Sequence, residues 1–99
     1  MNETIIEQHM PTIYTTSLWA AAYAMTRGAR LLGVYVRTGQ HFRNAFVLSN
    51  ENGIALQAVD DWWTDDPLVH ARALMSARLE LLNRMRKAEQ ASLQAMRGA

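Results

Sequence analysis

The chain has 99 residues, 49% of them hydrophobic, and a formal net charge of +1. This length supports one domain with a modest core and leaves little scaffold for a deep active site. The absence of cysteine excludes disulfides, thiolate metal sites and cysteine nucleophiles. The hydrophobic fraction and three tryptophans are generous for so small a domain, so we expect a homodimer or a higher oligomer.

Charges are unevenly distributed along the chain. No acidic residue stands between Glu7 and Glu51, an interval that holds Arg27, Arg30, Arg37 and Arg43. Residues 51–66 reverse this balance, with five acidic residues and no lysine or arginine. The basic residues are nine arginines and one lysine, which favours planar, bidentate recognition of phosphate or carboxylate, although biased codon usage in a GC-rich genome explains the ratio equally well.

Residues 1–13 show no hydrophobic period, and Pro11 prevents a helix from running through them, so we expect a flexible N-terminal arm. An additional edge strand over residues 12–15 is the alternative, because these residues favour β structure. The first residues have no basic region followed by a long apolar one, and no later stretch has about 18 uninterrupted apolar residues. We therefore expect a cytoplasmic protein without a membrane partner.

The first helix is predicted over residues 18–27, with Ser17 or Thr16 as N-cap and Gly28 as the left-handed residue after it. It is apolar nearly all round, which is typical of a helix buried on two sides. Trp19 and Tyr23 share one of its faces. We interpret both rings as core, ahead of any role in ligand binding.

Residues 31–48 are the one clear strand-turn-strand pattern, closed by Thr38-Gly39-Gln40. With Gly39 at the centre of the turn, Val34 lies opposite Asn44 and Tyr35 opposite Arg43. Strand alternation gives a buried face and an outer face. The buried face is predicted to hold Leu32, Val34, Val36, Phe42, Phe46 and Leu48. The outer face is predicted to hold Tyr35, Arg37, His41 and Arg43, with Leu31, Ala45 and Val47 nearer its base.

Two more helices follow. Residues 49–53 are turn residues that supply an asparagine N-cap for a helix over residues 54–63. The pair Asp66-Pro67 predicts the start of a third helix, with Asp66 as N-cap, which continues to about Lys87. Residues 88–99 are expected to be a frayed helical tail, so the domain is predicted over residues 14–87.

Arg78 falls in the middle of the apolar stripe of the third helix. An unpaired buried charge is costly, so we predict a structural ion pair with Asp60 or Asp61. The alternatives are an Arg78 side chain that reaches the edge of the stripe or one that points into a shared groove. Asp60 and Asp61 diverge by about 100 degrees on a helix, so they do not converge on a metal ion. We expect no metal site and no cofactor.

The order of elements resembles a family of short uncharacterised proteins of bacteria, phages and mobile elements, catalogued as a domain of unknown function. The resemblance covers about residues 14–85 and depends on short segments: 14–28, 31–34, 45–48, Trp62-Trp63 and 66–68. Residues 38–40 depart from the basic turn common in such proteins. The resemblance implies an architecture and a mobile-element setting, but no activity.

The predicted fold is therefore a small α+β domain of order α-β-β-α-α. One antiparallel β-hairpin packs against three helices, and dimerisation extends the sheet. We expect no enzyme, because no nucleophile-base pair, phosphate loop or metal-spaced cluster is present.

The favoured function is a nucleic-acid-binding accessory protein of a phage or mobile element that binds single strands. Tyr35, interleaved with Arg37, His41 and Arg43, supplies base stacking and phosphate neutralisation. The competing interpretation is that these side chains only solvate an exposed sheet face.

The alternative function is a dimeric adaptor that binds a host protein or a protein of the element and no nucleic acid. Its predicted interface residues are Trp19, Tyr23, Trp62 and Trp63, since exposed aromatic patches mark interfaces.

Overall fold

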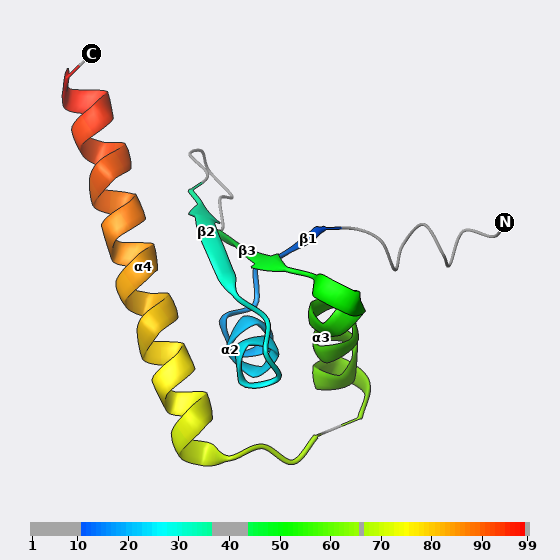
Figure 1. The fold of residues 1–99 in the computed structure, drawn as a ribbon. Coiled ribbons are helices and arrows are strands. Elements are labelled where there is room, and N and C mark those ends of the chain that lie inside the picture. The colour runs from blue at the N-terminus through cyan, green and yellow to red at the C-terminus, as the bar shows by residue number, and fades with distance from the viewer. Residues whose placement is uncertain (1–10, 37–43, 66, 99) are drawn as a thin grey trace, which may run out of the picture.

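The structure is a computed structural model that describes residues 11–36, 44–65 and 67–98. These residues form a three-stranded antiparallel sheet and three α-helices (Figure 1). The elements in chain order are β1 (Thr12–Thr15), α2 (Leu18–Thr26), β2 (Leu31–Tyr35), β3 (Ala45–Ser49), the 3₁₀ turn η1 (Glu51–Gly53), α3 (Ile54–Thr64) and α4 (Ala71–Gly98). The α+β class, with a hairpin and three helices, is confirmed. None of the described helices has the length and apolar character needed to cross a membrane.

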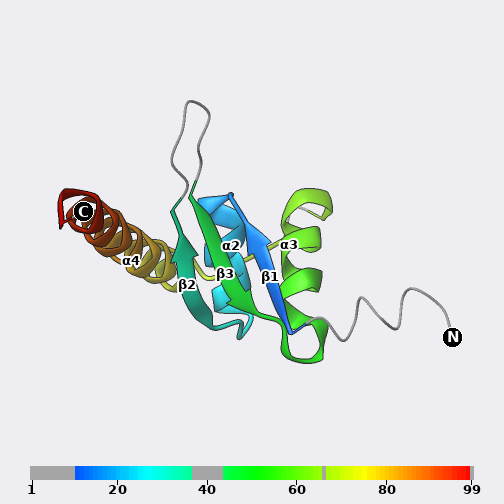
Figure 2. The same ribbon diagram turned by 90° about the horizontal axis from the view of Figure 1, so that it is seen from above.

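The sheet has the order β1-β3-β2, so β3 is its central strand (Figure 2). The edge of β3 that is not paired with β2 is occupied by β1 of the same chain. The sequence alternative of an edge strand over residues 12–15 is thus confirmed. The predicted arm extended too far, since Thr12 and Ile13 belong to β1; residues 1–10 lie outside the described residues.

The hairpin pairs in a different register from the predicted one. Val34 lies opposite Phe46 and Tyr35 opposite Ala45, instead of Asn44 and Arg43. In the described residues β2 ends at Tyr35 and β3 begins at Ala45. Residues 37–43, including Thr38-Gly39-Gln40, lie outside the described residues.

A bulge in β2 also changes which residues face the core. Leu31 pairs with Leu48, and the next pair along is Gly33 with Val47, so Leu32 is an extra residue on β2. A bulge reverses the in-and-out alternation on one side of it. Leu31 accordingly packs against the core while Leu32 is exposed, which is the opposite of the predicted assignment.

Helix α2 has the predicted ends. The Ser17 hydroxyl accepts a hydrogen bond from the Ala20 amide at 3.1 Å, which satisfies one of the free donors at the helix start. At the other end Gly28 has a φ of +110°, and the Ala29 amide donates back to the Ala24 carbonyl. Glycine reaches this backbone conformation without the steric penalty of a Cβ atom.

Replacing Gly28 by alanine is expected to lower the free energy of unfolding by about 1–2 kcal/mol. Nothing lies within 4 Å of an added Cβ, so backbone strain alone supplies the loss. Urea denaturation measures it. Gly33 has no positive φ and equally open surroundings, so a matched Gly33→Ala variant should lose clearly less free energy of unfolding.

Helix α2 is the centre of the packing. It lies beneath one face of the sheet, with α3 on one side and α4 on the other (Figures 1 and 2). Four of its side chains are alanines with no exposed surface, and small side chains let the neighbouring elements approach closely. The largest fully buried side chains are Phe46, Leu48 and Leu81.

Helix α3 confirms the predicted helix over residues 54–63, and a buried asparagine caps it. The Asn50 side-chain oxygen accepts from the Leu56 amide at 3.0 Å, across the intervening η1 turn. The turn itself needs left-handed residues, Asn52 at φ +56° and Gly53 at φ +74°.

Helix α4 begins at Ala71, four residues after the predicted start at Pro67. The His70 Nδ1 atom accepts from the Ala73 amide at 3.4 Å, so a histidine takes the capping position predicted for Asp66. Residues 67–70 are not helical, and Val69 packs against the core. The helix continues to Gly98 without a break, beyond the predicted domain end at 87.

Candidate nucleic-acid interface

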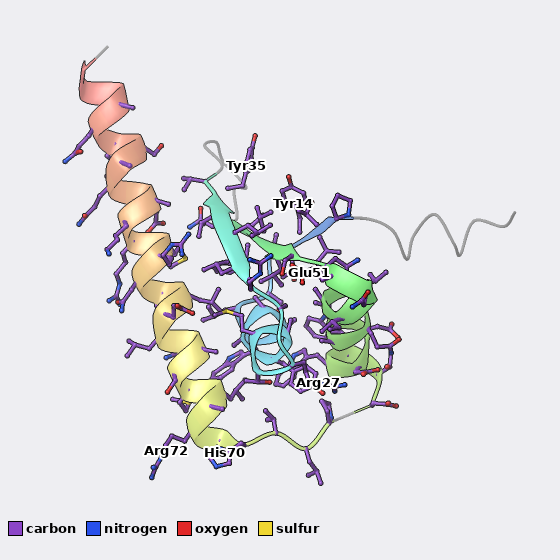
Figure 3. All side chains as sticks on the ribbon, in the orientation of Figure 1. Tyr14, Arg27, Tyr35, Glu51, His70 and Arg72 are labelled. Atoms are coloured by element: carbon purple, nitrogen blue, oxygen red, sulfur yellow. The ribbon has the colours of Figure 1, made fainter. Side chains whose placement is uncertain are left out.

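Two tyrosines stand on the sheet face that α2 does not cover. Tyr14 on β1 is 65% exposed and Tyr35 on β2 is 58% exposed. Figure 3 shows both rings pointing away from the helices. Tyr14 pairs with Val47 and Tyr35 with Ala45 on the central strand. The two tyrosines are therefore two strand spacings apart across the sheet and two residues apart along it. This corresponds to roughly 12 Å between their Cα atoms.

The sheet surface between the two tyrosine rings carries small side chains and no charge. Gly33 lies opposite Val47, and open space surrounds the position of an added Cβ. Ala45 is small and buried. None of the three strands contains an ionisable side chain other than the tyrosines. A planar group can thus reach each ring without displacing a charged neighbour.

Tyr35 is the one predicted nucleic-acid residue that lies in the described part of the chain, and it stands on the outer face as expected. Arg37, His41 and Arg43 lie outside the described residues, so their predicted positions stay predictions. Tyr14 was not predicted as a site residue. The signal was present, because residues 12–15 alternate and place buried Ile13 next to exposed Tyr14.

The end of the sheet where β2 begins and β3 ends holds a groove of mixed charge. Its lining includes Arg27, Arg30, Glu51, Asp60 and the exposed Leu32. Arg30 pairs with Glu51, and Arg27 donates to the Tyr23 hydroxyl at 2.7 Å. Since both cations already have partners and two acids line the same groove, it offers a phosphate chain little net attraction.

The four predicted interface aromatics fall into two groups. Tyr23 is buried, with its ring 5.6 Å from that of Trp62, so neither is a free docking residue. For Tyr23 the interface prediction is wrong, because α2 is enclosed by the sheet and two helices. Trp19 is partly covered, while Trp63 is 66% exposed.

Arg78 does not form the predicted ion pair with Asp60 or Asp61. Its guanidinium carbon lies 5.2 Å from the centre of the Trp19 ring. Among the described residues the ion pair is Arg30 with Glu51, and Asp61 accepts from Gln57 instead. The reason is the position of α2, which stands between α3 and α4 and offers Arg78 an aromatic ring in place of the acids.

Replacing Arg78 by methionine is expected to change the free energy of unfolding by less than about 1 kcal/mol. The Arg78 Nε atom is buried without a hydrogen-bond partner, and methionine of similar length still packs on Trp19. Chemical denaturation measures the change. A loss of about 3 kcal/mol or more would instead indicate a buried ion pair that the substitution breaks.

The described residues contain no group of three or more histidine, aspartate or glutamate side chains that could hold a metal ion. The family resemblance stays a prediction. Scans against family models, curated proteins and solved structures find no match to this chain.

Proposed function

We propose that the chain binds single-stranded nucleic acid on the outer face of its sheet, with Tyr14 and Tyr35 as stacking residues. The observation that carries this proposal is the pair of exposed tyrosines on a sheet face that none of the described helices covers and whose strands hold no charged side chain (Figure 3). Sheets with exposed aromatics bind single strands in this way, because every base has a planar face to stack on.

The stacking rings alone would bind weakly, so phosphate contacts are needed as well. Arg37 and Arg43 belong to the segment that joins β2 to β3, next in sequence to Tyr35. Arginine neutralises phosphate and releases counterions, which makes binding salt-dependent. The proposed ligand therefore lies across the tyrosines, with its backbone toward the hairpin connection.

The proposal favours single strands over duplex. In a duplex the bases are stacked on one another, so rings that project from a flat sheet have no base face to meet. In a single strand the bases are free to turn onto the rings.

Fluorescence-anisotropy titration of labelled single-stranded and duplex DNA, at about 50 and about 200 mM salt, tests the proposal. We expect tighter binding of the single strand and weaker binding at the higher salt. In an Arg37→Gln, Arg43→Gln variant, the slope of log affinity against log salt should fall by about 1.4. Equal binding of duplex, or no binding at the lower salt, would contradict the proposal.

If the titration shows no binding of DNA, the protein-binding adaptor remains as the alternative function. In that case the exposed apolar surface would bind a protein, and Arg37 and Arg43 would be dispensable for its capture.

A further inference from the structure

Large apolar side chains are exposed at one end of the molecule, although the core of the domain is built mostly from small ones. Most of the buried apolar residues are alanines, so the core is thin. By contrast, large apolar side chains are exposed over a short stretch of chain that includes the end of α3, residues 67–70 and the first turns of α4. They are Trp63, Leu68, Met75 and Leu79. Large exposed apolar surfaces on a protein mark interaction sites.

These residues belong to segments that lie on either side of α2 at the same end of the fold, which we call the connector end (Figure 1). Figure 1 shows the C-terminal end of α3 and the N-terminal end of α4 on either side of α2, at the end of the molecule away from the sheet, with residues 67–70 running between them. Figure 3 places His70 and Arg72 at this same end. The connector end is therefore distinct from the outer sheet face that holds Tyr14 and Tyr35.

Both helix ends here carry charges of the unfavourable sign. Asp60, Asp61 and Asp65 stand at the C-terminal end of α3, where the helix dipole disfavours anions. Arg72 stands in the first turn of α4, where the dipole disfavours cations. In the parts of the chain that the structure describes, none of these four side chains forms an ion pair. An opposite charge on a binding partner would stabilise each of these side chains.

We propose that a second copy of this chain docks on the connector end, which makes the protein a twofold-symmetric dimer. The acidic end of α3 in each copy faces Arg72 of the other, and Trp63 of each packs on Met75 and Leu79 of the other. A second copy is the occupant because the surface is self-complementary. It holds both the acids and the cation, and a twofold axis between the two helix ends makes every contact twice.

The mass of the protein in solution, measured by light scattering and sedimentation at several concentrations, tests this proposal with a matched pair of variants. Leu79 is 56% exposed and Leu93, further along the same helix, is 54% exposed. Leu79→Ser and Trp63→Ser are each expected to weaken the dimer by about tenfold or more, as central apolar contacts do. Leu93→Ser should leave its affinity unchanged.

A charge reversal gives an independent readout. Arg72→Asp should weaken the dimer, although it improves the interaction of α4 with its own dipole, so a loss cannot come from an unstable helix. Arg84→Asp, at an exposed position in the middle of α4, should have no effect. A monomer at every concentration would overturn the proposal. It would also be overturned by a dimer that withstands Leu79→Ser and Trp63→Ser, or that Leu93→Ser disrupts.

Discussion

A variant with both Tyr14 and Tyr35 replaced by alanine is expected to bind single-stranded DNA about 30-fold more weakly or worse. Stacking of a base on an aromatic ring contributes about 1–3 kcal/mol, so each single substitution should cost about 5- to 150-fold. The roughly 12 Å between the two Cα atoms lets each ring stack on its own base, so the two losses should add. Anisotropy titration at one fixed salt concentration measures all three variants.

The control is an aromatic residue of equal exposure elsewhere. Trp63 is 66% exposed and Tyr14 is 65% exposed, but Trp63 stands in the last turn of α3, at the connector end. Trp63→Ser should therefore leave the affinity for DNA unchanged under conditions where the oligomeric state is the same. Tyr14→Phe with Tyr35→Phe should retain binding, because the rings remain. An affinity that survives the double alanine variant would remove the sheet face as the binding surface.

Exposure of the tyrosines keeps this experiment interpretable. Their removal opens no cavity, and the strand preference lost with each ring is at most about 1 kcal/mol. Thermal unfolding followed by circular dichroism should show a folded protein. A loss of DNA affinity in a folded variant then reports on the interface.

Signals confined to neighbouring residues predicted the structure well. Ser17 and Gly28 mark the ends of α2, and both work through bonds or dihedral angles within a few residues of themselves. The turn over residues 49–53 placed the start of α3 for the same reason. Such signals are readable because the physical cause and the residue that reveals it lie side by side in the chain.

Features that depend on distant residues were not predictable in the same way. The bulge at Leu32 exchanges the roles of Leu31 and Leu32, and it is visible only in the pairing of β2 with β3. The start signal at Asp66-Pro67 is strong locally, yet α4 begins at Ala71. Val69 packs against the core from a non-helical segment, so tertiary contact outweighs the local preference.

The candidate site shows the same division. Tyr35 could be placed on the outer face from strand alternation alone. Tyr14 joins it only because β1 pairs with β3, a contact between strands some 30 residues apart in the chain. For Arg78, the sequence predicted an ion pair because the residue falls in an apolar stripe. The stacking on Trp19 depends on the position of α2 between two helices, which no local pattern contains.

Replacing Leu81 by alanine is expected to lower the free energy of unfolding by about 2–5 kcal/mol. Leu81 has no exposed surface and belongs to the buried core cluster, where it helps to hold α4 to the rest of the domain. Alanine favours helix at least as well as leucine, so the loss reports packing and not helix propensity.

Leu93→Ala on the same helix is the matched control and should change the free energy by less than about 0.5 kcal/mol, since its side chain is 54% exposed. Urea denaturation at one fixed protein concentration measures both variants, because dimer formation adds to the apparent stability. With so few large buried side chains in the domain, the neighbours of Leu81 have little freedom to fill the cavity, so we expect a loss in the upper half of that range. A loss below about 1 kcal/mol would show that α4 is held by other contacts.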